Sequence, residues 1–306
     1  MKLGLFLETA AVDHSRPIAP WSEIRETARR AEQVGFDGLF APDHLILRES
    51  PFWGITATAP RASLEAWTVL SALAGVTERV ELGSFVICNS FRNPALLAKM
   101  AMTLDEASDG RLILGLGAGS YAPEHAEFGY PYDHLGGRLE ESLQILVPLL
   151  REGRVDFSGR YHQAHGGELY PPARPGRPPI WVAAYGPRLM QLAARHADAF
   201  VTAWHTSPAG IGTIFSGFDE ACAAVGREPA SVGRVVGTFV ALGPDADLGG
   251  RRSASLRGSP REIAEQLEAL HAAGADYLVC WLSPGGRRGV ELFAPVLDAL
   301  RVPAGR

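Results

Sequence analysis

The fold of this chain is decided by one stretch, Pro179-Ile180-Trp181-Val182-Ala183-Ala184-Tyr185-Gly186-Pro187. Its apolar residues suit a buried strand, the Gly-Pro pair ends that strand, and a helical pattern follows at once. A helix that begins directly after a strand presents free backbone N–H groups, which bind anions such as phosphate. The alternative for the same Gly-Pro pair is a plain turn.

The same alternation of strand and helix extends over the whole chain. Because helices return each strand parallel to the one before, eight such units favour a (β/α)8 TIM barrel over an open sheet. The expected strands cover residues 2–7, 38–41, 80–88, 112–116, 199–203, 235–242 and 277–282, together with the strand at Ile180. The expected helices cover residues 21–34, 64–74, 94–107, 138–150, 187–196, 211–225, 260–273 and 290–300.

Three irregular segments interrupt this rhythm at about residues 45–61, 153–178 and 243–259. Residues 153–178 are rich in Pro, Gly and Arg with a short β-like piece at 155–161, and residues 243–259 are rich in Gly and Arg with few apolar residues. Both segments indicate insertions at the barrel rim rather than linkers. We therefore expect residues 1–306 to form a single domain. The segment 45–61 follows the second strand, so the barrel rule places it on the catalytic face.

The composition limits the function classes. With 46% hydrophobic residues, 21% charged residues and a net charge of −5, the composition is typical of a soluble globular protein. It does not indicate binding to nucleic acid or to an anionic membrane. It enters a strand pattern without a leader-like segment, so we expect a cytoplasmic protein. Cys88, Cys222 and Cys280 lack metal-binding or disulfide spacing, and no histidine pairs with a carboxylate at ligand spacing, so no metal is expected.

Asp43 and His44 come directly after the second expected strand, where barrel enzymes place reacting groups. A histidine there titrates near neutral pH, and a neighbouring carboxylate can bind a ligand or organise hydrogen bonds. These two residues are our candidate catalytic pair. A helix-capping Asp beside an exposed His is the alternative.

Two strand ends carry small residues that suggest close backbone approach. Gly115-Leu116-Gly117-Ala118-Gly119 lacks the Rossmann spacing, since Ser120 stands where the third glycine would be. We interpret it as a bare strand end against which a planar ligand can lie, with turn glycines as the alternative. The Gly83-Ser84 step suggests a bulge in the third strand, with an ordinary buried strand as the alternative.

Many ordered motifs carry a family resemblance over nearly the whole chain. The chain resembles the bacterial luciferase-like superfamily of flavin- and deazaflavin-dependent oxidoreductases, whose fold is a TIM barrel with an inserted segment. The matching segments are 35–38 with Asp43-His44, 65–67, 73–74, 77–83, 91–99, 103–105, 108–112 leading to the glycines, 128–129 and 181–187.

The resemblance implies where a cofactor binds. The ring is expected over a bulge in the third strand, often with a non-proline cis peptide, and this maps onto Ser84, Phe85 and Val86. The resemblance further implies a proton-transferring His44 and an Asp43 that contacts the polar edge of the ring. The ribityl chain is expected along Gly117, Ala118 and Gly119, and the phosphate against Ala183, Ala184, Tyr185, Gly186 and Pro187.

The branch of the superfamily decides the chemistry. Bacterial luciferase has an arginine on the fourth-strand loop where this chain has Ala118, and the loop with Glu124-His125 and Phe128-Gly129 is more similar to the coenzyme F420 branch. We therefore expect an F420-dependent oxidoreductase that transfers hydride between the deazaflavin and a small organic substrate. The alternatives are an FMNH2-dependent monooxygenase and a non-catalytic flavin-binding subunit.

The sequence says less about partners. We expect a small-molecule substrate, and Phe52, Trp53 and Trp281 favour an apolar or aromatic one. We also expect a homodimer.

Overall fold

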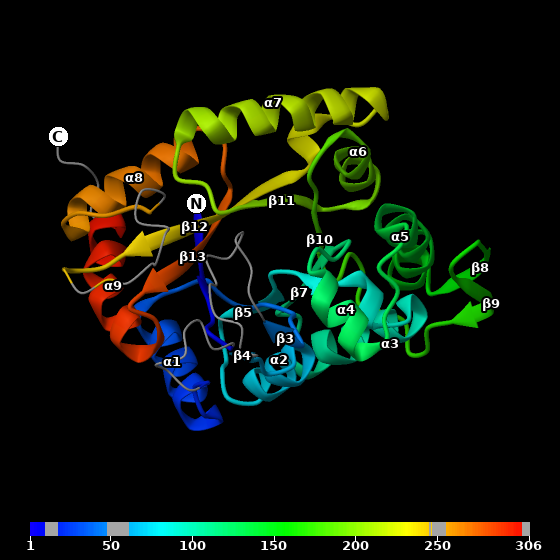
Figure 1. The fold of residues 1–306 in the computed structure, drawn as a ribbon, viewed down its shortest axis with the longest axis horizontal. Helices are drawn as coiled ribbons and strands as arrows, with labels where there is room; N and C mark the ends of the chain where they lie inside the picture. Colours follow the sequence, from blue (N-terminus) through cyan, green and yellow to red (C-terminus); the bar gives the residue numbers. More distant parts are fainter. Residues whose placement is uncertain (10–17, 48–60, 245, 247–254, 302–306) are drawn as a thin grey trace.

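The fold comes from a computed structural model, which describes residues 1–9, 18–47, 61–244, 246 and 255–301 (Figure 1). Eight parallel strands follow one another around a closed barrel, because β10 pairs with β7 as well as with β11 and so joins the two ends of the sheet. The expected (β/α)8 TIM barrel is confirmed. Its strands are β1 (Lys2–Phe6), β2 (Gly38–Ala41), β5 (Glu81–Ser84), β7 (Leu112–Gly117), β10 (Ile180–Ala183), β11 (Ala199–Ala203), β12 (Gly233–Ala241) and β13 (Tyr277–Ser283).

Helices cover the outside of the barrel (Figure 1). Several boundaries agree with the local signals: α3 begins with the Asn93 side chain capping two backbone N–H groups and Pro94 following, and α8 begins with a capping box of Ser259 and Glu262. None of the helices in the described ranges has the length and apolarity to cross a membrane. The helices are α1 (Trp21–Val34), α2 (Ala66–Ala74), α3 (Pro94–Ala107), α4 (Ala122–Phe128), α5 (Leu135–Glu152), α6 (Pro187–His196), α7 (Pro208–Ala224), α8 (Pro260–Ala272) and α9 (Gly286–Arg301).

The third strand of the barrel differs from the prediction, because it is divided into two parts. A single strand over residues 80–88 is wrong, because β5 ends at Ser84 and pairing resumes only in β6 (Ile87–Cys88), followed by a short turn of 3-10 helix at Asn89–Phe91. The peptide bond between Phe85 and Val86 is cis, as the family resemblance implied.

The insertions are described to different extents. Within residues 153–178, β8 (Arg154–Ser158) and β9 (Gln163–Glu168) form an antiparallel hairpin beside α5, where the Glu141 carboxylate accepts three backbone N–H groups of the turn at residues 160–162. At the two ends of the segment 45–61, β3 (Ile46–Leu47) and β4 (Arg61–Ala62) pair as a short antiparallel ladder. Phe52 and Trp53, and most of the segment 243–259, lie outside the described residues.

The core has two layers, one on each side of the barrel wall. The larger layer lies between the strands and the helices and includes Leu3, Leu5 and Leu7 of the first strand region. The smaller layer fills the barrel interior and is mainly aromatic, with the Phe40 and Trp181 rings stacked 5.4 Å apart. Because alternate residues of a strand face opposite sides, each strand supplies both layers.

Candidate functional site

The fold brings together the three segments predicted to hold a cofactor. β7 pairs with β6 and with β10, so the glycines of β7 lie between the cis peptide and the 183–187 loop. A Cβ atom on Gly115 would lie 2.2 Å from the Ser84 carbonyl oxygen, and one on Gly117 would lie 2.7 Å from Val86 Cγ2 and 3.9 Å from Ala183 Cβ. The Ser84 hydroxyl also donates to the Gly115 carbonyl at 2.8 Å. Only glycine fits at these two positions of β7.

The loop at residues 183–187 ends in an open helix start. Gly186 is the N-cap of α6, with φ of 79° and ψ of 161°, and no side-chain hydrogen bond caps this helix. No atom lies within 4 Å of where a Cβ on Gly186 would stand, and Gly186 and Pro187 are exposed while Ala184 is buried. A solvent-accessible first turn without a side-chain cap suits an anion.

His44 is held by a buried carboxylate. Its Nδ1 lies 3.1 Å from Glu124 Oε1, and the other carboxylate oxygen accepts the Leu45 backbone N–H at 2.9 Å. The Glu124 side chain, from α4, is 3% exposed, whereas that of His44 is 16% exposed. Tyr121 packs edge-on against the imidazole, with ring centroids 6.3 Å apart. With Nδ1 directed to Glu124, Nε2 lies on the side of the ring that faces away from this carboxylate.

Asp43 has a different set of partners. Its buried carboxylate accepts Arg92 Nη1 at 2.7 Å, Arg92 Nη2 at 3.1 Å and the Cys88 backbone N–H at 2.9 Å. Arg92 also donates to Glu65, which caps the N-terminus of α2. Burial opposes the charge of Arg92, but hydrogen bonding and attraction from Asp43, together with Glu65, outweigh burial and raise the pKa of Arg92. This network joins the segment after β2 to Cys88 of β6, two residues beyond Val86 of the cis peptide.

Cys88 and His125 lie next to this network without forming a reactive pair. Cys88 Sγ is 3.6 Å from His125 Nε2, and His125 Nδ1 is 2.8 Å from the Pro131 carbonyl oxygen. Burial raises the pKa of the Cys88 thiol to about 12, so the thiol is neutral at physiological pH. Within the part of the chain that the structure describes, no three His, Cys, Asp or Glu residues are grouped as metal ligands.

Sequence reasoning gave no role to Arg92, Glu65 or Glu124. Arg92 and Glu124 stand in motifs that carry the family resemblance, yet their partners lie 49 and 80 residues away along the chain. The signal that could have found them is their place after the carboxyl ends of barrel strands, where loops from distant parts of the chain meet.

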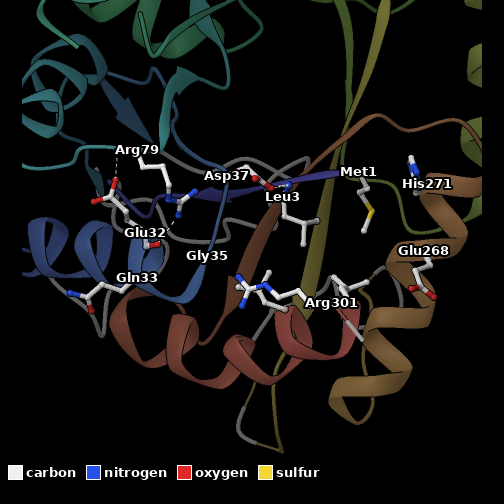
Figure 2. A pocket seen from close by; sticks show the side chains of 12 residues that line it. Met1, Leu3, Glu32, Gln33, Gly35, Asp37, Arg79, Glu268, His271 and Arg301 are labelled. Carbon is white, nitrogen blue, oxygen red and sulfur yellow. Dashed lines mark hydrogen bonds between the residues drawn. The ribbon is translucent and has the colours of Figure 1, made fainter. Parts of the chain in front are cut away.

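A cavity of about 690 Å³ lies elsewhere, at the amino-terminal end of the barrel (Figure 2). Its polar groups are largely occupied: the Asp37 carboxylate accepts the Leu3 backbone N–H, and Glu32 accepts the N–H groups of residues 78–80. Barrel enzymes react at the opposite end, so this cavity is separate from the candidate active site.

Comparisons with known proteins identify the family of this chain. A family model described as luciferase-like monooxygenase matches residues 1–248. The chain is 37% identical over 186 residues to an F420-dependent glucose-6-phosphate dehydrogenase of Intrasporangium calvum, a match that covers 58% of this chain and 53% of that protein. It is 32% identical over 235 residues to a phthiodiolone/phenolphthiodiolone dimycocerosates ketoreductase of Mycobacterium bovis, covering 72% of this chain and 61% of that protein.

The solved structures extend the likeness over the whole fold. An F420-dependent secondary alcohol dehydrogenase, solved in complex with an F420-acetone adduct, superposes with a TM-score of 0.78 at 21% identity and covers 98% of this chain and 99% of that chain. By contrast, the chain spans little more than half the length of the curated relatives it matches. Because the family model covers most of the residues, the chain belongs to the luciferase-like monooxygenase family.

Proposed function

We propose that this protein is an F420-dependent oxidoreductase that transfers hydride between the deazaflavin and a small organic alcohol or carbonyl compound. The observation that carries the proposal is that Val86, Gly117 and Ala183 meet at the carboxyl end of β7, the same end of the barrel at which His44 follows β2. The relatives named above support it, since the dehydrogenase uses F420 and the ketoreductase is named for the reduction of a ketone.

The residues present fit a deazaflavin. Gly115 and Gly117 carry no side chain where any Cβ would collide with the segment at residues 84–86, so this segment packs directly on β7 and is available as the surface on which a flat ring lies. The first turn of α6 offers N–H groups for the phosphate, with Ala184 and Gly186 keeping bulk away. When bound, F420 supplies a two-electron hydride acceptor or donor and does not activate oxygen well.

His44 is assigned the proton that accompanies the hydride. In alcohol oxidation the substrate C–H bond breaks with both electrons leaving as hydride, the O–H proton passes to Nε2 of His44, and a carbonyl compound remains. In the reverse direction Nε2 returns the proton to the carbonyl oxygen. The Glu124 carboxylate on Nδ1 keeps Nε2 directed away from itself and stabilises the protonated ring.

Asp43 is assigned a positioning role in this proposal. Its carboxylate is bonded to Arg92 and to the backbone of β6, so it fixes the strand that follows the cis peptide and, through the chain, its neighbour His44. The pair Asp43 and Arg92 is buried, and removing Arg92 would leave the Asp43 carboxylate as an uncompensated buried charge, at a cost of about 3–5 kcal/mol.

A ligand titration tests the cofactor. We expect purified protein to bind F420 with micromolar or tighter affinity and to bind FMN and reduced FMN far more weakly, as followed by the fluorescence of each cofactor. We expect turnover to persist without oxygen, because hydride passes directly between deazaflavin and substrate. Preferential binding of reduced FMN, with oxygen from labelled dioxygen in the product, would establish the luciferase-like monooxygenase alternative instead.

The phosphate site is tested by a matched pair of variants at Gly186. Both Gly186→Ala and Gly186→Glu carry the same backbone strain at φ of 79°, but only Glu adds a negative charge to the helix N-terminus. We expect Glu to weaken F420 binding about tenfold or more relative to Ala, measured by fluorescence titration. Equal affinities of the two variants would place the phosphate elsewhere.

Three expectations from the sequence stay predictions. They are a single domain over residues 1–306, a cytoplasmic location and a homodimer. Light scattering on the purified protein checks the last of these.

A further inference from the structure

Two acid-histidine dipeptides meet at the carboxyl end of the barrel: Asp43-His44 after β2 and Glu124-His125 in α4. The histidine of the first binds the acid of the second, with His44 Nδ1 3.1 Å from Glu124 Oε1. The two remaining residues, Asp43 and His125, both contact Cys88 of β6. Cys88 therefore forms a second connection between the two dipeptides.

Cys88 makes this connection with two different groups. Its backbone N–H donates to Asp43 Oδ2 at 2.9 Å, and its Sγ lies 3.6 Å from His125 Nε2. The Pro131 carbonyl oxygen, 2.8 Å from His125 Nδ1, can only accept a hydrogen bond, so Nδ1 carries a proton and Nε2 of the neutral ring is an acceptor. Burial raises the pKa of the Cys88 thiol to about 12, so the thiol keeps its proton and donates to Nε2.

The short helix α4 depends on these contacts. Of its seven residues, all within the described part of the chain, only Glu124 and His125 are buried. The His125 ring also packs against Phe91 and Tyr132, at centroid distances of 5.3 and 5.0 Å. The position of α4, and with it that of the Glu124 carboxylate, is therefore set by the partners of these two polar side chains.

Gly119, which follows β7, packs directly on the contact between Cys88 and His125. A Cβ at this position would lie 2.8 Å from Cys88 Sγ and 3.1 Å from His125 Nε2, and the φ of 92° is one that favours glycine. A side chain there would push the thiol and the imidazole apart. The contact therefore accounts for the last glycine of the segment 115–119.

We infer that Cys88 and His125 are positioning residues for the proton-transferring His44. They hold the Glu124 carboxylate against its Nδ1 atom, while Cys88 also fixes Asp43, the residue before His44. The inference rests on the proposed function, in which this carboxylate stabilises the protonated ring. Loss of the thiol would leave a buried ring nitrogen without its donor, and α4 would then hold Glu124 less closely at His44.

The test follows the ring nitrogens of His44 by NMR in cofactor-free protein whose histidines carry ¹⁵N, with His44→Ala to identify the signals. Glu124→Gln gives the position of the Nδ1 signal without the carboxylate. In Cys88→Ala we expect this signal to move about half of that distance or more, because Glu124 no longer stays at the ring. Cys88→Ser keeps a donor on the same carbon and should return the signal close to its wild-type position.

Two further variants make the test specific. His125→Asn keeps a donor for the Pro131 carbonyl but has no acceptor at the position of Nε2, so it should match Cys88→Ala and takes its place if that variant does not fold. Cys222→Ala is the matched control, because it removes another buried thiol, from α7, and the His44 signals should not move.

The inference is wrong if Cys88→Ala or His125→Asn leaves the Nδ1 signal at its wild-type position, if Cys88→Ser behaves like Cys88→Ala, or if Cys222→Ala moves the signal as far. None of these comparisons involves the cofactor. If wild-type protein does not bind F420, the proposed function fails, while the NMR comparison still decides whether the two positioning residues hold Glu124 at His44.

Discussion

Replacing His44 by alanine should lower turnover by about 100-fold or more while F420 affinity stays nearly unchanged. The reason is that a positioned acid or base contributes on the order of 10²–10⁴ in rate, and His44 is the residue assigned to the substrate proton. Its imidazole is bonded through Nδ1 to Glu124 and packs edge-on against Tyr121. The measurement is steady-state kinetics together with cofactor titration, which separates loss of chemistry from loss of binding.

Glu124→Gln should lower turnover less than His44→Ala does. Glutamine keeps the size of the side chain and an oxygen for the Leu45 N–H, but it loses the negative charge that stabilises a protonated His44. We expect about a tenfold fall in kcat with little change in KM or in F420 affinity, since a carboxylate bonded to a histidine acts through the orientation of the ring and through its own charge.

His165→Ala serves as the control for both variants. His165 stands on the β8–β9 hairpin with 65% of its side chain exposed, so turnover should match wild type. A His44→Ala enzyme with wild-type turnover would remove His44 from the mechanism, and the proton would have to pass to another group.

Much of the barrel was predictable because its signals are local. The boundaries of α1, α3 and α6 coincide with those expected, since each is marked by neighbouring residues: Gly35 after α1, Asn93-Pro94 before α3 and Gly186-Pro187 before α6. Helix caps and turn residues act over three or four positions, which is the range that a sequence pattern reports.

The remaining features depend on contacts that a pattern does not report. The break in the third strand falls in the apolar run Phe85-Val86-Ile87, where periodicity predicts a continuous strand. The Gly83-Ser84 step suggests a bulge nearby, and the family resemblance places it at residues 84–86. The short helix α4 was missed because its seven residues are too few for a clear helical period. The pairing of Glu124 with His44 requires both the barrel to close and α4 to form.

Substitution of Gly115 in β7 gives the largest structural effect that we expect. Alanine at Gly115 places its Cβ 2.2 Å from the Ser84 carbonyl oxygen, and that oxygen belongs to backbone immediately before the cis peptide, so it cannot turn aside as a flexible side chain would. The strand must move instead. Gly115 is buried in β7, where it faces Trp181 of β10 in the parallel register, so the displacement also disturbs barrel packing.

We expect Gly115→Ala to lower the free energy of unfolding by about 3 kcal/mol, at the upper end for overpacking a core, and to weaken F420 binding about tenfold or more. Denaturant unfolding and fluorescence titration measure the two effects. Gly212→Ala is the control, because Gly212 lies inside α7 with no atom within 4 Å of a Cβ, and alanine there should stabilise the protein by about 0.5–1 kcal/mol.

The two measurements together decide whether Gly115 serves the packing of the barrel, the binding of the cofactor or both. If Gly115→Ala loses stability but binds F420 as well as wild type, Gly115 serves only the packing of the barrel, and the cofactor does not depend on the position of residues 84–86. If stability and affinity both stay at wild-type values, the backbone accommodates the methyl group, and the absence of a side chain at Gly115 has no role in cofactor binding. The combined loss is the result expected of a strand whose lack of side chains places the cis-peptide segment beneath the ring of a bound deazaflavin.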